Sequence, residues 1–132
     1  MAKPLILIIE DDTNLAEAMS EVLSDIGCTV LRTECSEEGL RLATERQPDL
    51  VLCDVVLPDG QGFDTVSKLR GNPVTSQAAI VLMTGDQDKS NYEGAGKSML
   101  LLKPFSLAML TEVVRGTLAA KGIVLNREEV AA

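Results

Sequence analysis

The chain lacks histidine and tryptophan and has few aromatic side chains of any kind. Without histidine, the protein cannot use an imidazole as a general base or metal ligand, and it cannot carry a phosphohistidine of its own. The aromatic residues, 2% of the chain, are Phe63, Tyr92 and Phe105. So few rings disfavour a flavin-dependent electron carrier and any surface that stacks nucleic-acid bases.

Basic residues are few as well. The chain has 12 Lys and Arg against 20 Asp and Glu, for a net charge of −8, and the basic residues are scattered singly. Nucleic acid and anionic membranes require clustered basic residues, so we expect neither as a partner. No apolar run is long enough to cross a bilayer, and residues 1–4 do not resemble a signal peptide. The three cysteines form no CxxC motif, which indicates reduced thiols and a cytoplasmic protein.

The 132 residues, 45% of them hydrophobic, suffice for one domain with one core. We predict a folded domain over residues 1–121 and a weakly ordered tail over residues 122–132. Apolar runs typical of buried strands alternate along the domain with segments of helical periodicity. The predicted strands are residues 5–9, 28–33, 50–53, 79–83 and 99–102.

Four helices are predicted between and after these strands. Their apolar faces lie in residues 15–26, which end at Gly27, in residues 36–47 before Pro48, in residues 63–69, and in Leu107, Leu110, Val114 and Leu118 after the cap Ser106. Residues 58–62 have loop composition, and residues 86–97 predict a poor, short helix or a loop. The alternation predicts an α/β fold: a doubly wound, five-stranded parallel sheet with helices on both faces.

Polar side chains follow four of the predicted strands. They are Glu10 and Asp11, Asp54, Thr84, and Lys103. Ligands of such sheets bind outside the carboxyl ends of the strands, so we expect these groups to form a site. Converging carboxylates repel each other, and a divalent cation and the Lys103 ammonium would relieve that repulsion. Mg²⁺ fits an oxygen-only ligand set of this kind, and the whole set suits phosphoryl transfer to a carboxylate.

Taken singly, each residue has a simpler structural explanation. The acids after the first strand could cap a helix, as Asp12 does in our prediction, and Asp54 could begin a loop. Thr84 and Lys103 alone would be ordinary strand-end and surface residues. The functional interpretation depends on all of these residues occurring together, each group at the end of its own predicted strand.

Four segments together resemble the receiver domain of bacterial two-component response regulators. They are LIIEDD at residues 7–12, CDVVLPDGQG at 53–62, VLMTG at 81–85 and LKPF at 102–105. The resemblance extends from residue 5 to about residue 120. It implies a (βα)5 flavodoxin-like fold in which Asp54 accepts a phosphoryl group from the phosphohistidine of a histidine kinase. Asp11, Asp54 and the Val56 backbone carbonyl would bind Mg²⁺, with Glu10 assisting through water.

By the same resemblance, Thr84 and Lys103 contact the acyl phosphate and signal its presence to a downstream protein partner through the surface near the last two strands. The peptide bond between Lys103 and Pro104 is expected to be cis. Two features depart from the family. The segment between Thr84 and Lys103 is short and glycine-containing, which predicts a short or distorted fourth helix, and Leu100 replaces the usual aromatic switch residue.

Other functions stay open at this point. The domain could relay the phosphoryl group to a histidine phosphotransferase, either as a free-standing protein or as part of a hybrid kinase. A Mg²⁺-dependent phosphatase with an aspartyl nucleophile is disfavoured because residues 10–14 lack the DxDx[TV] spacing. A scaffold independent of phosphorylation could have lost the acids, the threonine or the lysine, yet all are present. We expect a signalling domain whose only enzymatic activity is at most self-dephosphorylation, and no DNA-binding output from these residues.

Overall fold

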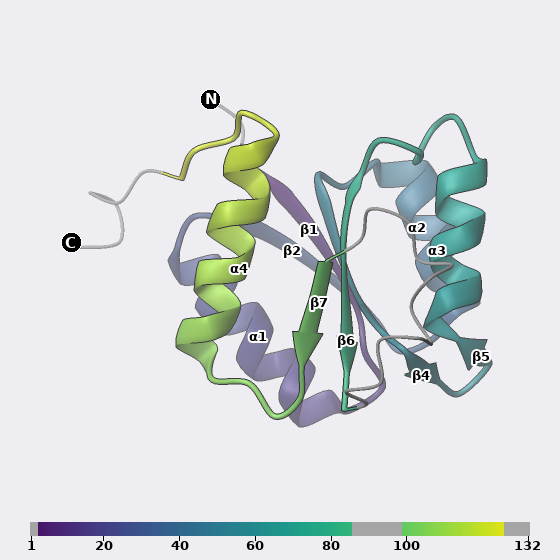
Figure 1. Ribbon diagram of the computed structural model, residues 1–132, viewed down its shortest axis with the longest axis horizontal. Coiled ribbons are helices and arrows are strands. Elements are labelled where there is room, and N and C mark those ends of the chain that lie inside the picture. The colour runs from purple at the N-terminus through teal and green to yellow at the C-terminus, as the bar shows by residue number, and fades with distance from the viewer. Residues whose placement is uncertain (1–2, 86–98, 126–132) are drawn as a thin grey trace.

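The computed structural model describes residues 3–85 and 99–125. Its main sheet has five parallel strands in the order β2-β1-β3-β6-β7. The strands are β1 (Leu5–Ile9), β2 (Thr29–Thr33), β3 (Leu50–Asp54), β6 (Ala79–Thr84) and β7 (Met99–Leu102). The order changes direction at β1, because β2 lies on one side of it and the later strands on the other. The predicted doubly wound α/β fold is confirmed (Figure 1).

Helices cover both faces of the sheet. Helices α1 (Thr13–Asp25) and α4 (Leu107–Ala120) pack together on one face, and α2 (Ser36–Arg46) and α3 (Gly62–Gly71) pack together on the other (Figure 1). No helix in the described ranges is long and apolar enough to cross a membrane.

The continuous apolar runs arise because each central strand faces two cores. In β1, Ile6 and Ile8 join the core under α1 and α4, whereas Leu7 and Ile9 join the core under α2 and α3. All four side chains are fully buried. Since side chains alternate across a strand, a strand covered on both faces needs an apolar residue at every position.

Several local predictions hold in detail. Asp12 caps α1 by accepting a hydrogen bond from the Leu15 amide, and Ser106 caps α4 by accepting one from the Met109 amide. Gly27 follows α1 with φ of 103°, a left-handed conformation that favours glycine. The Lys103–Pro104 peptide bond is cis, as the family resemblance implied.

Other local predictions need correction. Residues 58–62 are more ordered than a loop: β4 (Val56–Leu57) and β5 (Gly60–Gln61) form a small antiparallel hairpin, and α3 begins at Gly62. Leu107 was placed on the buried face of the last helix, but its side chain is exposed. It is the first residue of α4, and the core begins one turn later at Leu110. Cys28 lies just before β2, which starts at Thr29.

Two predictions fall on other parts of the chain. The short or distorted fourth helix was expected within residues 86–97, which lie outside the described residues. The same holds for residues 126–132 of the expected tail. Of the tail residues that are described, Leu125 is buried and packs with the core under α1 and α4.

The two leucines at the start of α4 provide a test of its orientation. We expect Leu110→Ala to lower the free energy of unfolding by about 2–5 kcal/mol, because it leaves a cavity in a fully buried position. Leu107→Ala should change it by less than about 0.5 kcal/mol, as is usual at the surface. Urea denaturation of both variants measures the difference, and similar losses would contradict the orientation of α4.

Candidate functional site

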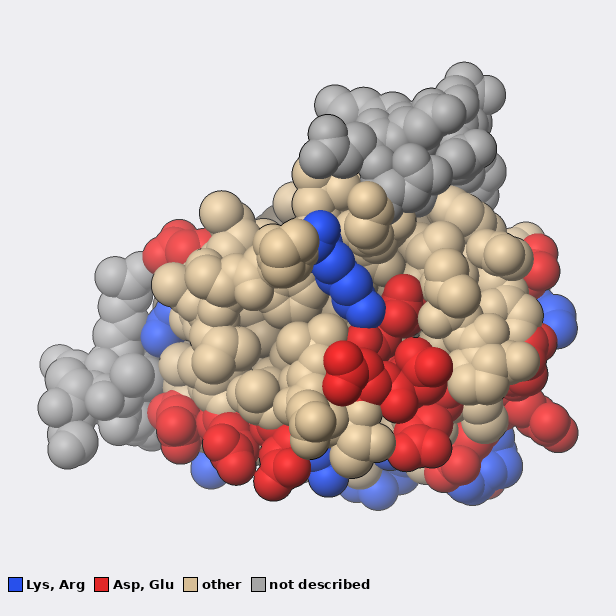
Figure 2. All heavy atoms as spheres, turned by 90° about the horizontal axis from the view of Figure 1, so that it is seen from below, with Lys and Arg blue, Asp and Glu red and all other residues tan. Residues whose placement is uncertain are grey.

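The site lies where the parallel strands end. Acidic side chains gather on the face seen from below in Figure 2, the side toward which the β7 arrow points in Figure 1, and basic side-chain atoms lie against them. Glu10 and Asp11 directly follow β1, Asp54 is the last residue of β3, and Thr84 is the last residue of β6. The structure therefore brings the predicted residues to one edge of the sheet.

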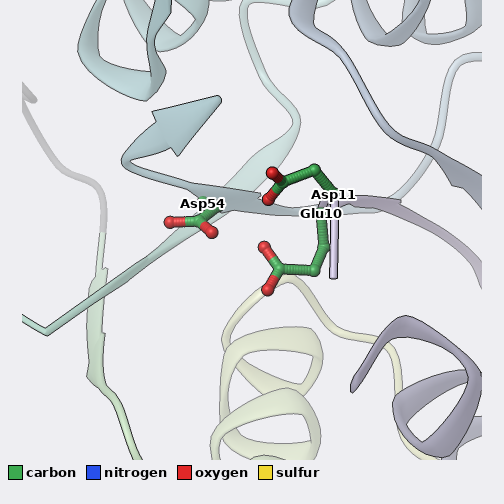
Figure 3. Close-up of side chains that lie close together, drawn as sticks. All are labelled: Glu10, Asp11 and Asp54. Carbon is green, nitrogen blue, oxygen red and sulfur yellow. The ribbon is translucent and has the colours of Figure 1, made fainter. Parts of the chain in front are cut away.

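Three of these side chains form an acidic cluster. One carboxylate oxygen from each of Glu10, Asp11 and Asp54 lies within 4.8 Å of the others. The carboxylates of Glu10 and Asp11 point toward Asp54 (Figure 3). Glu10 and Asp54 are buried, while Asp11 is exposed and forms the open side of the cluster.

Lys103 links two of the acids. Its ammonium Nζ donates to Glu10 Oε1 at 2.7 Å and to Asp54 Oδ2 at 2.9 Å. These two contacts connect Lys103, the residue after β7, to the ends of β1 and β3. Because the ammonium is only partly exposed, solvent screens these ion pairs less than those at an open surface.

The two buried acids have opposite pKa shifts. Burial, and then the closeness of Asp54, raise the pKa of Glu10 to about 8, although Lys103 acts in the opposite direction. Burial alone would raise the pKa of Asp54 too. However, hydrogen bonds from Glu10, Lys103 and the Val56 amide outweigh burial and hold the pKa of Asp54 below its usual value. Without a metal ion, Glu10 therefore keeps a proton more readily and Asp54 stays ionised.

Backbone groups complete the surroundings of Asp54. The Val56 N–H donates to Asp54 Oδ1 at 3.1 Å. The Lys103 N–H donates to the Thr84 carbonyl at 2.7 Å, which fixes the start of the lysine against the end of β6. Thr84 itself is buried.

The acidic cluster fits a hard divalent cation. Its donors are carboxylate oxygens, the ligand type that Mg²⁺ prefers. Glu10 Oε2 is buried and has no protein hydrogen-bond partner among the described residues, so one oxygen of the cluster is left for a ligand to satisfy. No histidine is present, and Cys53 is a poor ligand because burial, followed by the charges of Asp54 and Glu10, raises the pKa of its thiol to about 12.

One polar residue near the site has a role that the sequence analysis did not identify. Asp59, assigned to a loop, accepts backbone hydrogen bonds from Ser36 and Glu37 at the start of α2. The sequence predicted Ser36, a good capping residue, at the start of that helix, and so gave no sign that Cys35 occupies the N-cap position without a side-chain hydrogen bond.

The fold and the geometry agree with the comparisons to known proteins. Residues 6–115 match the model of the response regulator receiver domain family. The chain belongs to this family, and the predicted resemblance is confirmed.

The relatives include longer regulatory proteins. The chain is 31% identical over 112 residues to an uncharacterized transcriptional regulatory protein, YcbL, of Bacillus subtilis, covering 85% of this chain and 50% of the relative. It is 32% identical over 118 residues to the DNA-binding dual master transcriptional regulator RpaA of Synechocystis, covering 87% and 49%. The chain thus spans about half the length of the curated relatives it matches.

Solved structures show the same architecture. A two-component response regulator from Clostridium difficile has a TM-score of 0.83 at 26% identity and covers 92% of this chain and 100% of its own. The receiver domain of a sensor histidine kinase from Pseudomonas aeruginosa has a TM-score of 0.81 at 23% identity, over 89% and 99%. The latter was solved with a magnesium ion coordinated in its active site cleft.

The raised pKa of Glu10 predicts a pH dependence of stability. In metal-free solution, the folded protein holds a proton on Glu10 that the unfolded chain releases, so the free energy of unfolding should fall as the pH rises from 4.5 to about 8. Asp54 does not offset this loss, because its lowered pKa affects stability only as the pH falls below 3.8. Glu10→Gln, which mimics the protonated acid, should remove that part of the loss.

Urea denaturation of both proteins in EDTA, at about pH 5 and about pH 8.5, measures the effect. Glu17→Gln, at an exposed position on α1, is the matched control and should behave like the wild type. If the free energy of unfolding changed equally with pH in the wild type and in Glu10→Gln, the raised pKa of Glu10 would be contradicted.

Proposed function

We propose that this receiver domain accepts a phosphoryl group on Asp54 and uses it as a signal. The observation that carries the proposal is the environment of Asp54, which combines an ammonium at 2.9 Å, two neighbouring carboxylates and a backbone N–H at 3.1 Å. A nucleophilic carboxylate needs to be ionised and held in place, and the lowered pKa and these contacts supply both conditions.

The donor in this proposal is a phosphohistidine on a histidine kinase or a histidine phosphotransferase, since this chain has no histidine of its own. One carboxylate oxygen of Asp54 attacks phosphorus, and a P–O bond forms as the P–N bond breaks. The electron pair of the broken bond returns to the imidazole of the donor. The product is an acyl phosphate on Asp54.

Mg²⁺ would be held by Asp11, Asp54 and the Val56 backbone carbonyl, with Glu10 assisting through water. When bound, it would offset negative charge on the phosphoryl oxygens. The Lys103 ammonium supplies further positive charge beside Asp54, 2.9 Å from its Oδ2. The acidic cluster and its fit to an oxygen-binding cation support this assignment.

Thr84 and Lys103 are the residues through which we propose that phosphorylation is sensed. Each contacts the acyl phosphate in this proposal, and the hydrogen bond between their backbones means that movement of one affects the other. The response would reach a downstream protein at the surface near β6 and β7. The aromatic switch of the family is replaced here by the half-buried Leu100, so the response involves a different side chain.

A relay to a histidine phosphotransferase would use the same acyl phosphate in reverse, and no observation favours it over the leading proposal. The family membership does not favour the phosphatase. We propose signalling without catalysis other than self-dephosphorylation, no direct contact of this domain with nucleic acid or membrane, and a cytoplasmic location, which suits the three free cysteines.

The proposal predicts a single phosphorylation. After incubation with acetyl phosphate and Mg²⁺, we expect intact-mass spectrometry to show one added phosphoryl group, and Asp54→Asn to lose it because the amide oxygen is a poor nucleophile. Asp64→Asn, at an exposed position on α3, should be modified like the wild type. Modification that persists in Asp54→Asn would place the acceptor elsewhere. No modification by either acetyl phosphate or a purified phosphohistidine protein would overturn the proposal.

Mg²⁺ should also stabilise the folded protein. At a hundredfold excess over its dissociation constant, binding adds about 2.7 kcal/mol to the free energy of unfolding and raises the melting temperature. Asp11→Ala should remove most of this gain, with little effect on the metal-free protein because the side chain is exposed. Thermal unfolding with Mg²⁺ or EDTA measures both effects. An unchanged response in Asp11→Ala would exclude this residue as a ligand.

A further inference from the structure

Asp59 caps a helix that is remote from it in sequence. It lies between β4 and β5, and its Oδ1 and Oδ2 accept hydrogen bonds from the Ser36 N–H at 2.8 Å and the Glu37 N–H at 3.0 Å. These are the first two N–H groups of α2, which have no partners within the helix. Cys35, at the N-cap position, makes no side-chain hydrogen bond to them. Asp59 therefore fixes the tip of the hairpin to the start of α2.

This contact forms despite unfavourable neighbours. The first turn of α2 already carries Glu37 and Glu38, and Asp59 adds a third carboxylate. Hydrogen bonds from the Ser36 and Glu37 amides hold the pKa of Asp59 below its usual value, so it is ionised at neutral pH. Charge-assisted bonds to backbone N–H groups are stronger than neutral ones. The start of α2 also favours a negative charge.

The other end of the hairpin contacts the site. Val56 pairs with Gln61 across the hairpin, and its N–H donates to Asp54 Oδ1. The Val56 side chain is 67% exposed, so packing contributes little to its position. Val55 and Leu57, on either side of it, are buried in the core under α2 and α3, and the hydrogen bonds of Asp59 add a polar contact at the tip of the hairpin.

We propose that Asp59 is a positioning residue for Asp54. Its hydrogen bonds to α2 hold the hairpin so that the Val56 backbone stays against the Asp54 carboxylate. The functional part of this inference rests on the proposed function, in which Asp54 is the acceptor and the Val56 carbonyl binds Mg²⁺. A second polar contact is made by α2 in the same region: the Ser36 and Thr65 hydroxyls form a hydrogen bond that joins α2 to α3.

Amide hydrogen exchange tests the positioning directly. We expect Asp59→Ala to accelerate exchange of the Val56 N–H by about fivefold in the metal-free protein, because its hydrogen bond to Asp54 is held less firmly. The Leu52 N–H, in the core of β3, should keep its rate. Asp64→Ala removes a carboxylate from an exposed position on α3 and should leave both rates unchanged.

A second pair of variants breaks the contact from the helix side. Ser36→Pro removes the N–H that Asp59 binds, and proline is well tolerated at the first position of a helix. Cys35 has φ −138° and ψ 160°, a conformation that suits the residue before proline. Ser36→Ala keeps the N–H but also lacks the hydroxyl. Faster Val56 exchange in Ser36→Pro than in Ser36→Ala therefore isolates the backbone bond.

The functional readout is the phosphorylation rate with acetyl phosphate at saturating Mg²⁺. We expect Asp59→Ala to be slower by about tenfold, since a small misplacement of a reacting group is costly. Wild-type exchange of Val56 in Asp59→Ala, equal acceleration at Leu52, or an unchanged phosphorylation rate would each overturn the positioning role. Failure of the wild type to be phosphorylated would instead overturn the proposed function, while Val56 exchange would still show whether Asp59 holds the hairpin.

Discussion

The hydrogen bonds of the Lys103 ammonium to Glu10 and Asp54 are the interaction on which the site depends. Lys103 follows β7, an edge strand, yet its side chain reaches past the end of β6 to acids at the ends of β3 and β1. Two buried carboxylates without a cation would repel each other and lose hydration at the same time. The lysine relieves both effects for Asp54. At Glu10, burial and the neighbouring Asp54 outweigh the lysine and raise the pKa.

The backbone around Asp54 is as constrained as its side chain. Gly62, the first residue of α3, lies so close to β3 that a Cβ atom there would overlap the Asp54 carbonyl oxygen. The Gly62 N–H donates to the Val55 carbonyl at 2.6 Å. A glycine is needed at this point because of the close approach. It lets α3 begin directly beside the end of β3, with only the short hairpin between them.

The sequence predicted the sheet and the site well because both follow from local patterns. Apolar runs locate strands, and parallel topology brings the residues after them to one edge of the sheet, so the sequence alone predicts that Glu10, Asp11 and Asp54 lie together. Leu107 was misplaced because periodicity cannot tell where the core begins along a helix. The bonds of Asp59 to α2 could not be predicted, because a hydrogen bond between distant segments leaves no periodic pattern.

Two kinds of positioning therefore meet at Asp54. The strand that carries it is held by burial, since Leu50–Cys53 are completely inaccessible and neighbouring strands pair with them on both sides. In the hairpin, the Val56 side chain is exposed, and polar contacts of Asp59 with α2 supplement the burial of Leu57. Surface hydrogen bonds contribute little to global stability, whereas buried apolar contacts contribute most of it. We consequently expect changes in the hairpin to alter the surroundings of Asp54 at a smaller cost in the free energy of unfolding than changes in the buried strands.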